Sequence, residues 1–169
     1  KYLSDPRVRL VARKENGGVT AGTNQGVTLA NGKFLIFAQC DDACDARMIE
    51  RLVAAVQAQP SAALAFSRSL MIDEHDCVIG DDFTVRENSF RRRCAVDTLI
   101  DRREMRRFLL HSCVIPNLSG VLFRRSCFAD VGLFSSNYRA CLDWDLFFRL
   151  CDRYDFCYVA EPLNHFRQH

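Results

Sequence analysis

A short apolar run that ends in paired carboxylates is the feature that most limits how this chain can fold. The run spans residues 33–38 and lies between the turn residues Asn31 and Gly32 and the acids Asp41 and Asp42. An apolar run of this length, rich in Phe and Ile, predicts a central strand that is covered on both faces. Because ligands of open α/β sheets bind beyond the carboxyl ends of the strands, the paired acids fall where a ligand site is expected.

The two adjacent carboxylates can serve a metal ion or only the local fold. They repel each other unless a cation lies nearby. Oxygen ligands suit Mg²⁺ or Mn²⁺, which usually bind together with substrate phosphates. Asp is also a common turn and cap residue. Asp41 and Asp42 therefore have a structural alternative, a loop followed by the cap of the next helix, and the pair alone does not decide between the two.

Composition places the chain among globular proteins of a single domain. It has 169 residues, of which 49% are hydrophobic and 26% charged, with a formal net charge of +2. This length allows a substantial core, and the small net charge gives no indication of a nucleic-acid or membrane partner. No apolar run approaches the ~20 residues of a membrane-spanning helix, and no signal peptide is recognisable. The chain begins with Lys1 rather than Met, so we interpret it as a piece of a longer protein.

The nine cysteines show neither a disulfide framework nor a zinc pattern. Their number is odd, no Cys-x-x-Cys pair occurs, and the closest spacings are Cys40 to Cys44 and Cys151 to Cys157. Most of them lie in apolar surroundings. We therefore predict reduced thiols in a cytosolic protein, without a zinc finger.

The first part of the chain is predicted to form a strand, a helix and a second strand. A strand is expected at 8–12, followed by a loop whose glycines at 17–18 allow positive φ or the close approach of a ligand. Small residues in a helix at 19–30 allow it to pack closely on a sheet, and the turn at 31–32 ends it. With the strand at 33–38, this is the βαβ unit of a parallel sheet.

The later elements follow from the same kinds of pattern. Apolar residues at helical spacing predict helices, and short apolar runs between turn residues predict strands. In order, these elements are a helix at 47–59 capped by Asp45, a strand at 62–67, a hairpin of 70–72 and 77–79, a helix at 98–110, a strand at 121–124, a helix at 126–131, a helix at 143–153 and a strand at 156–160.

Seven arginines cluster between residues 91 and 107. They would suit a mobile flap that reaches an anionic substrate, or a solvated helix face beside a surface loop. Charge runs are more commonly solvated, so we favour the second interpretation.

Acidic residues also begin the helix predicted at 143–153. Asp143 and Asp145 fall in its first turn, where the helix dipole favours carboxylates, so both have a structural explanation. A catalytic role would require one of them to face the cleft. Beyond the last strand, His165, Arg167 and His169 lie on one side of an extended segment. A histidine there is either a metal ligand near the paired Asp residues or simply exposed.

Eight short segments carry a further signal when they are taken in order. They are residues 5–9 (DPRVR), 15–19 (ENGGV), 24–26 (NQG), 30–35 (ANGKFL), 40–42 (CDD), 119–125 (SGVLFRR), 141–146 (CLDWDL) and 166–169 (FRQH). Together they resemble the family 2 glycosyltransferases, the nucleotide-sugar-dependent inverting transferases with the GT-A fold. The ordered set is fairly specific, and it raises the metal interpretation of Asp41 and Asp42 above the structural one.

Three departures from the family pattern are visible. The family's first half-domain, which holds the nucleotide base, is expected upstream of Lys1. Gln39 stands where the family has the first Asp of Asp-x-Asp. Leu142 stands where the family has the Glu of Glu-Asp, while Asp143 keeps the position that resembles the base.

The resemblance implies an α/β fold of the GT-A type, with a mostly parallel, Rossmann-like sheet, helices on both faces and an incomplete N-terminal nucleotide-binding half. A single domain would span 1–169, with the remainder of the donor- and metal-binding part in 1–79 and the acceptor side in 80–169. Mn²⁺ or Mg²⁺ would neutralise charge on the leaving diphosphate. The implied site residues are Asp143 as general base; Asp41, Gly17, Gly18 and Asn24 for the nucleotide-sugar; Asp41, Asp42 and His169 for the metal; and Trp144, Ser119 and Gly120 for the acceptor.

The implied partners are a nucleotide-sugar donor, in the first instance a UDP-sugar, and a saccharide or lipid-linked acceptor, without nucleic acid. The implied location is the cytoplasm, including the inner face of a membrane. Trp144 would form an apolar wall for a sugar ring, or else only anchor its helix to the core.

A transferase-like module that binds or scaffolds without turnover is the alternative function. Gln39 and the missing first half favour it, whereas Asp41, Asp42 and Asp143 argue against it. A sugar nucleotidyltransferase would need a glycine-rich phosphate loop near its amino terminus, which this sequence lacks.

Overall fold

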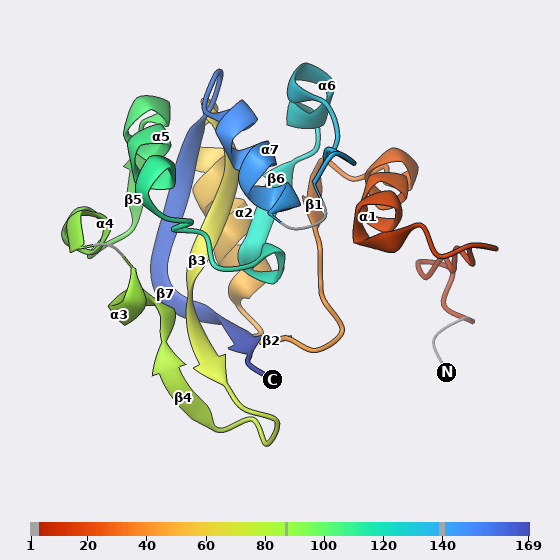
Figure 1. The fold of residues 1–169 in the computed structure, drawn as a ribbon, viewed down its shortest axis with the longest axis horizontal. Helices are drawn as coiled ribbons and strands as arrows, with labels where there is room; N and C mark the ends of the chain where they lie inside the picture. The colour runs from red at the N-terminus through yellow and green to blue at the C-terminus, as the bar shows by residue number, and fades with distance from the viewer. Residues whose placement is uncertain (1–3, 87, 139–140) are drawn as a thin grey trace.

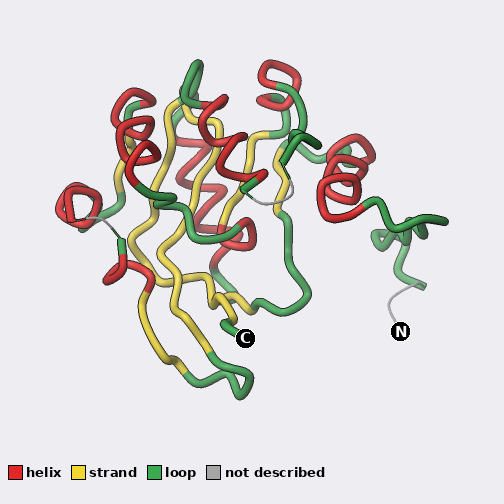
Figure 2. The backbone as a smooth tube through the Cα atoms, viewed as in Figure 1, coloured by secondary structure: helices red, strands yellow, loops and turns green. Residues whose placement is uncertain are grey.

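The computed structural model describes residues 4–86, 88–138 and 141–169, which form one mixed sheet with helices on both of its faces (Figures 1 and 2). The strands are β1 (Phe34–Ile36), β2 (Ala43–Cys44), β3 (Ala62–Ile72), β4 (Val78–Asp81), β5 (Thr98–Ile100), β6 (Val121–Arg124) and β7 (Asp155–Arg167). The helices are α1 (Gly18–Leu29), α2 (Met48–Ala58), α3 (Asp82–Val85), α4 (Asn88–Arg93), α5 (Arg102–His111), α6 (Cys127–Val131) and α7 (Leu142–Leu150), with a 3₁₀ turn η1 (Leu118–Gly120).

The strands follow the order β1-β6-β3-β7-β2, with β4 paired to β3 and β5 paired to β7. The predicted α/β class with helices on both faces is confirmed. The strand directions differ from the mostly parallel sheet that we expected: within the described ranges β3 and β7 are parallel, and the other pairs are antiparallel. Apolar runs in a sequence reveal strands, but they do not encode the direction in which two strands pair.

Each face of the sheet has its own apolar core. On one face α2 places Leu52 and Val56, both fully buried, against Ala65 of β3. On the other face α7 places Phe147 on Phe123 of β6, with the two rings stacked at 6.3 Å between centroids. Figure 1 shows these two helices on opposite sides of the strands. The helical spacing of apolar residues explains which side of each helix is buried.

Strand β7 is longer than predicted, and it carries the C-terminal segment to the acidic loop. In place of a strand at 156–160 followed by a turn, it continues beside β3 as far as Arg167. Pro162 is tolerated because it lies at a shift in register, where the ladder is already interrupted. The second half of β7 also pairs with β2, through Ala43 and His165. The last residues therefore reach the loop that follows β1.

Two predictions at the N-terminal side are wrong. Residues 8–13 are exposed and form no strand, and no described strand pairs with them. A strand is stable only where a neighbour satisfies its backbone groups. The strand predicted at 33–38 to be central is the three-residue β1, which is half-buried and lies at the edge of the sheet beside β6.

The other predicted elements agree with the structure apart from one split, whereas β2, α3 and α4 were not predicted. α1, α2, β3, β6, α6 and α7 lie close to their expected positions, and β3 and β4 form the predicted hairpin. The helix predicted at 98–110 divides into β5 and α5, because the side chain of Asp101 accepts a hydrogen bond from Arg103 N at 2.8 Å and caps a new helix. No helix in the described ranges is both long and apolar enough to cross a membrane.

All nine cysteines are free thiols, and four of them are buried. Burial raises the pKa of Cys94, Cys127 and Cys151 to about 12 and that of Cys157 to about 11. Such thiols carry very little thiolate at neutral pH, so these four are poor nucleophiles.

Candidate functional site

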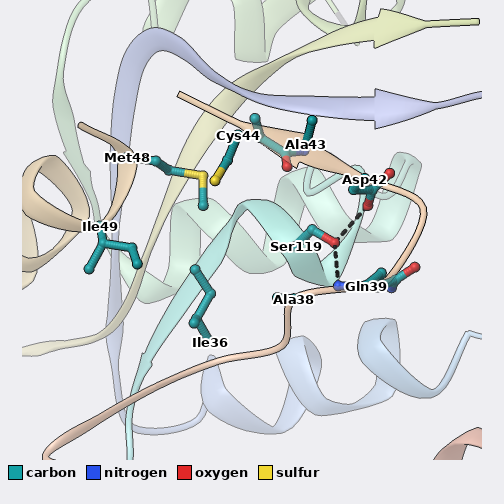
Figure 3. Close-up of a pocket in the computed structure, with 10 residues that line it drawn as sticks. Ile36, Ala38, Gln39, Asp42, Ala43, Cys44, Met48, Ile49 and Ser119 are labelled. Carbon is teal, nitrogen blue, oxygen red and sulfur yellow. Dashed lines mark hydrogen bonds between the residues drawn. The ribbon is translucent and has the colours of Figure 1, made fainter. Parts of the chain in front are cut away.

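The acidic loop after β1 is held in place by the carboxylate of Asp42. Its Oδ2 accepts hydrogen bonds from Asn117 Nδ2 at 2.7 Å and from Ser119 Oγ at 2.6 Å. Its Oδ1 accepts a hydrogen bond from Arg167 N at 2.9 Å. Ser119 Oγ also accepts from Gln39 N at 3.3 Å, and Figure 3 shows the bonds of Ser119 to Asp42 and Gln39 beside a small cavity. Asp42 therefore joins the acidic loop to η1 and to the end of β7.

A buried chain of amides extends from Asp42 into the sheet. Asn164 Nδ2 donates to Asn117 Oδ1 and to Ser69 Oγ, at 2.9 Å in both cases. Asn164 and Ser69 are fully buried. Because the oxygen of Asn117 accepts from Asn164, its nitrogen is left to donate to Asp42. A Cβ at Gly120 would come within 3.2 Å of Asn164, so the glycine makes room for this chain.

Arg167 ties the acidic loop to the β3–β4 hairpin. Its Nε donates to the backbone oxygen of Asp41 at 2.7 Å. Its guanidinium also donates to the backbone oxygen of Asp73 and, at 2.5 Å, to Oδ1 of Asp76. Together with its backbone contact to Asp42, these bonds hold the end of β7, the acidic loop and the hairpin turn against one another.

Asp41 and His169 are the exposed side chains of this cluster. His169 Nε2 lies 3.4 Å from Asp41 Oδ2, and the side chains are 65% and 42% exposed respectively. The backbone of Asp41 is held by Arg167. The fold therefore leaves one carboxylate and one imidazole next to each other at the surface.

A divalent metal at this point would have few protein ligands. No three His, Cys, Asp or Glu side chains of the described residues converge on one point. Asp42 Oδ2 already accepts two hydrogen bonds, so only its Oδ1 retains capacity. Mg²⁺ and Mn²⁺ commonly take one or two carboxylates and complete their shells with substrate phosphates and water. Asp41 with His169 beside it fits a metal bound in that way, whereas the geometry of Asp42 fits an anchor.

The cavity behind the acidic loop is small and mostly apolar. It has a volume of about 90 Å³ and is lined by Ile36, Cys44, Met48 and Ile49 as well as by Asp42 and Ser119 (Figure 3). Ligand pockets of drug-sized molecules are several times larger. The cavity is therefore too small for a ligand of that size.

The predicted donor residues at the start of α1 line an open groove. Gly17, Gly18 and Asn24 border it together with Tyr138. Gly18 has a φ of +73°, a left-handed conformation that glycine adopts without strain. The amide of Asn24 exchanges two hydrogen bonds of 2.9 Å with the backbone of Phe134. The side chain of Asn24 is therefore already used to fasten α1 to the following loop.

The predicted base and its neighbour lie in the first turn of α7. Asp143 is half-buried, and its Oδ1 accepts a hydrogen bond from Trp144 N at 2.9 Å. Trp144 Nε1 donates to the backbone oxygen of Leu109 at 3.1 Å, and its ring stacks on Phe148 at 6.5 Å. The hydrogen bond to Leu109 anchors α7 to α5, whereas the ring contact lies within α7. Trp144 thus has a structural role in holding its helix.

The structure thus brings Asp41, Asp42, Ser119 and His169 into one cluster, while Gly17, Gly18 and Asn24 lie at α1 and Asp143 and Trp144 lie on α7. Sequence reasoning missed the amides of Asn117 and Asn164 and gave Arg167 no role. One signal was available for Asn117, which stands inside the apolar stretch from Val114 to Leu118. Asn164 and Arg167 lie in a more polar stretch, where no such signal marks them. A buried polar side chain needs partners, so such residues commonly belong to a network.

The comparisons with known proteins agree on one family. The sequence profile of glycosyl transferase family 2 matches residues 1–132. A PGL/p-HBAD biosynthesis glycosyltransferase of Mycobacterium bovis is 29% identical over 138 residues, which are 80% of this chain and 44% of that protein. The chain thus spans less than half the length of this relative.

The fold is similar to that of TarS from S. aureus. The structure of TarS residues 1–349 matches with a TM-score of 0.60 at 14% identity, over 89% of this chain and 40% of that one. The structure of the same protein in complex with UDP-GlcNAc matches with a TM-score of 0.58 at 13% identity, over 86% of this chain and 38% of that one. At this level of identity the match concerns the fold alone, and it supports the GT-A-like class.

Proposed function

The chain belongs to glycosyl transferase family 2, and on this premise we propose that it is part of an enzyme that transfers a sugar from a nucleoside-diphosphate donor to an acceptor hydroxyl, with inversion. One observation carries the proposal. Three donors hold the carboxylate of Asp42, which leaves Asp41 and His169 exposed beyond the ends of β1 and β7. Ligands of α/β sheets bind in this kind of position.

Mn²⁺ or Mg²⁺ is the proposed cofactor, with Asp41 and His169 as its protein ligands. When bound, such an ion neutralises charge that develops on the leaving diphosphate. Asp42 orients the loop that carries Asp41, and Arg167 fixes the backbone oxygen of Asp41. The residues of this chain therefore prepare the position of the carboxylate before the donor arrives.

Asp143 is the proposed general base for the acceptor hydroxyl. Its half-buried carboxylate lies in the first turn of α7 and accepts a hydrogen bond from Trp144 N. Ser119, Gly120 and Trp144 are the proposed acceptor-side residues. Because the indole N–H of Trp144 already donates a hydrogen bond to the backbone oxygen of Leu109, Trp144 would contact a sugar through the face of its ring.

A UDP-sugar is the proposed donor, because a protein of similar fold, TarS, was solved in complex with UDP-GlcNAc. Gly17, Gly18 and Asn24 would border the donor along the groove at α1. In this proposal residues 1–79 hold the remainder of the donor and metal part, and residues 80–169 hold the acceptor side. The acceptor is a saccharide or a lipid-linked sugar, and the protein acts in the cytoplasm, including the inner face of a membrane.

Calorimetric titration of the full-length protein with UDP-GlcNAc, with and without Mn²⁺, tests the proposal together with a transfer assay on saccharide acceptors. We expect metal-dependent binding, slow hydrolysis or transfer, and a product whose anomeric configuration by NMR is opposite to that of the donor. Retention of configuration would contradict inversion. Binding without turnover for every common nucleotide-sugar would favour the alternative of a transferase-like binding module.

A further inference from the structure

Helices α4 and α5 carry an excess of arginine. They contain seven arginines and one acidic residue, Glu104. Arg93 pairs with Glu104 at 3.1 Å. Arg106 pairs with Asp152 at 2.7 Å. Three other arginines are exposed, and no carboxylate of the described residues forms an ion pair with them: these are Arg92, Arg103 and Arg107.

Helical spacing gathers several of these side chains on one side of α5. Residues at i, i+3, i+4 and i+7 of a helix share a face. In α5 these residues are Arg103, Arg106, Arg107 and Leu110. The opposite side is buried in the core, with Met105 and Leu109 fully inaccessible. Leu110 is 68% exposed, so an apolar side chain stands within a cationic stripe.

A shallow groove between α4 and α5 continues this surface. The titratable residues of its lining are basic apart from one acid, and it is lined by Ser89, Arg93, Glu104, Arg107, Phe108 and His111. Arginine guanidinium groups bind phosphate oxygens in a forked geometry, so the groove suits a phosphate group. We call the surface made by Arg93, Arg103, Arg107, Leu110 and His111 the cationic face.

The cationic face is built on a firmly held helix. Asp101 caps α5 through Arg103 N, and Asp155 Oδ1 accepts a hydrogen bond from Arg102 N at 3.0 Å. At the other end, the backbone oxygen of Leu109 accepts the indole N–H of Trp144. The exposed side chains therefore project from a fixed base.

We propose that the cationic face docks on the surface of an anionic phospholipid bilayer, with Leu110 entering the headgroup region. Basic side chains near a membrane are attracted to anionic headgroups, and an exposed apolar side chain adds burial at the interface. Single-stranded nucleic acids usually stack on exposed aromatic residues. The one aromatic residue of α5, Phe108, is buried, so the lipid surface fits this face better.

Docking has a consequence for the acceptor side. The hydrogen bond between Trp144 and Leu109 joins α5 to α7, whose first turn holds Asp143. A membrane against the cationic face would thus lie next to the helix that carries the proposed base. This consequence rests on the proposed function and favours a lipid-linked acceptor; the docking itself does not depend on sugar transfer.

Co-sedimentation of the full chain with vesicles tests the proposal. The probes are phosphatidylcholine vesicles and vesicles that also contain phosphatidylglycerol, at low and at physiological salt. We expect binding to the anionic vesicles only, weakened by salt. The double variant Arg103→Glu/Arg107→Glu should lower the partition constant by about tenfold or more. Leu110→Ser should lower binding but leave its salt dependence.

A matched control reverses the same number of charges elsewhere. Arg9 and Lys14 are exposed and belong to the N-terminal segment, far from α5 along the long axis of the molecule (Figure 1). Arg9→Glu/Lys14→Glu should bind vesicles like the wild type, and melting curves should show both double variants folded. The proposal is overturned if the wild type ignores anionic vesicles at low salt, or if both double variants lose binding equally. Binding of an RNA oligonucleotide in place of vesicles would overturn it as well.

Discussion

Arg167 donates a backbone hydrogen bond of 2.9 Å to Oδ1 of Asp42, although the two residues are 125 positions apart. The bond joins the last strand to the loop after β1. It is one of the contacts that distinguish Asp42 from its neighbour Asp41. Asp42 turns inward and accepts three hydrogen bonds, whereas Asp41 keeps its carboxylate at the surface beside His169.

Asp42→Ala should destabilise the fold. It leaves Asn117 Nδ2, Ser119 Oγ and Arg167 N without their acceptor, and an unsatisfied, partly buried polar group typically costs about 1–3 kcal/mol. We expect a loss of about 2–4 kcal/mol in the free energy of unfolding, because some of these groups will find water. Urea denaturation of the variant and the wild type measures this difference in the free energy of unfolding. Asp42→Asn, which keeps one oxygen acceptor, should cost less, and equal stability of the alanine variant and the wild type would refute the anchor role.

Asp41→Ala should leave the stability nearly unchanged. The side chain is exposed, and substitutions of that kind usually change the free energy of unfolding by less than about 0.5 kcal/mol. Donor binding in the presence of Mn²⁺ should nevertheless weaken strongly, because one of two proposed metal ligands is gone. The check is calorimetric titration beside a melting curve. Unchanged Mn²⁺-dependent binding would place the metal site elsewhere.

Asp143→Asn should separate catalysis from stability. Asn is similar in size, so the main structural loss is the charge near the helix N-terminus, which is worth about 0.3–1 kcal/mol. A general base contributes roughly 10²–10⁴-fold to a rate. Turnover should therefore fall by that factor, while the melting temperature and donor binding stay close to those of the wild type. A variant that keeps its turnover within a few-fold would make Asp143 a structural residue only.

The loss of thermal stability at acid pH should depend on Arg68. Arg68 Nε donates to Asp81 Oδ1 at 3.0 Å, and this guanidinium holds the pKa of the Asp81 carboxyl below its usual value. A carboxyl with a lowered folded-state pKa stabilises the fold above its unfolded pKa of about 4, and this contribution is lost as the pH falls through the folded pKa. Melting temperatures measured from pH 6 downwards should fall less steeply in Arg68→Gln than in the wild type. If the melting temperatures of the two proteins fall with equal slopes, the stabilising role of the Arg68–Asp81 contact is contradicted.

Part of the fold and of the candidate site can be read from local patterns. The apolar spacing of α2 and α7 predicts both helices, because one buried face is a property of the segment itself. The polar turn between β3 and β4 predicts their hairpin in the same way. The acids at 41–42 follow a strand, as expected, and the groove at α1 contains the glycines at 17–18.

The tertiary structure alone decided the direction of the strands, the edge position of β1 and the partners of the two acids. The sequence by itself determined that Asp41 and Asp42 follow an apolar strand, but both residues have the same local propensity, so no local pattern separates them. What separates them are donors that lie 75, 77 and 125 positions away, on Asn117, Ser119 and Arg167. A hydrogen bond forms only when the folded chain brings donor and acceptor within about 3 Å, and that distance is set by the packing of the whole sheet.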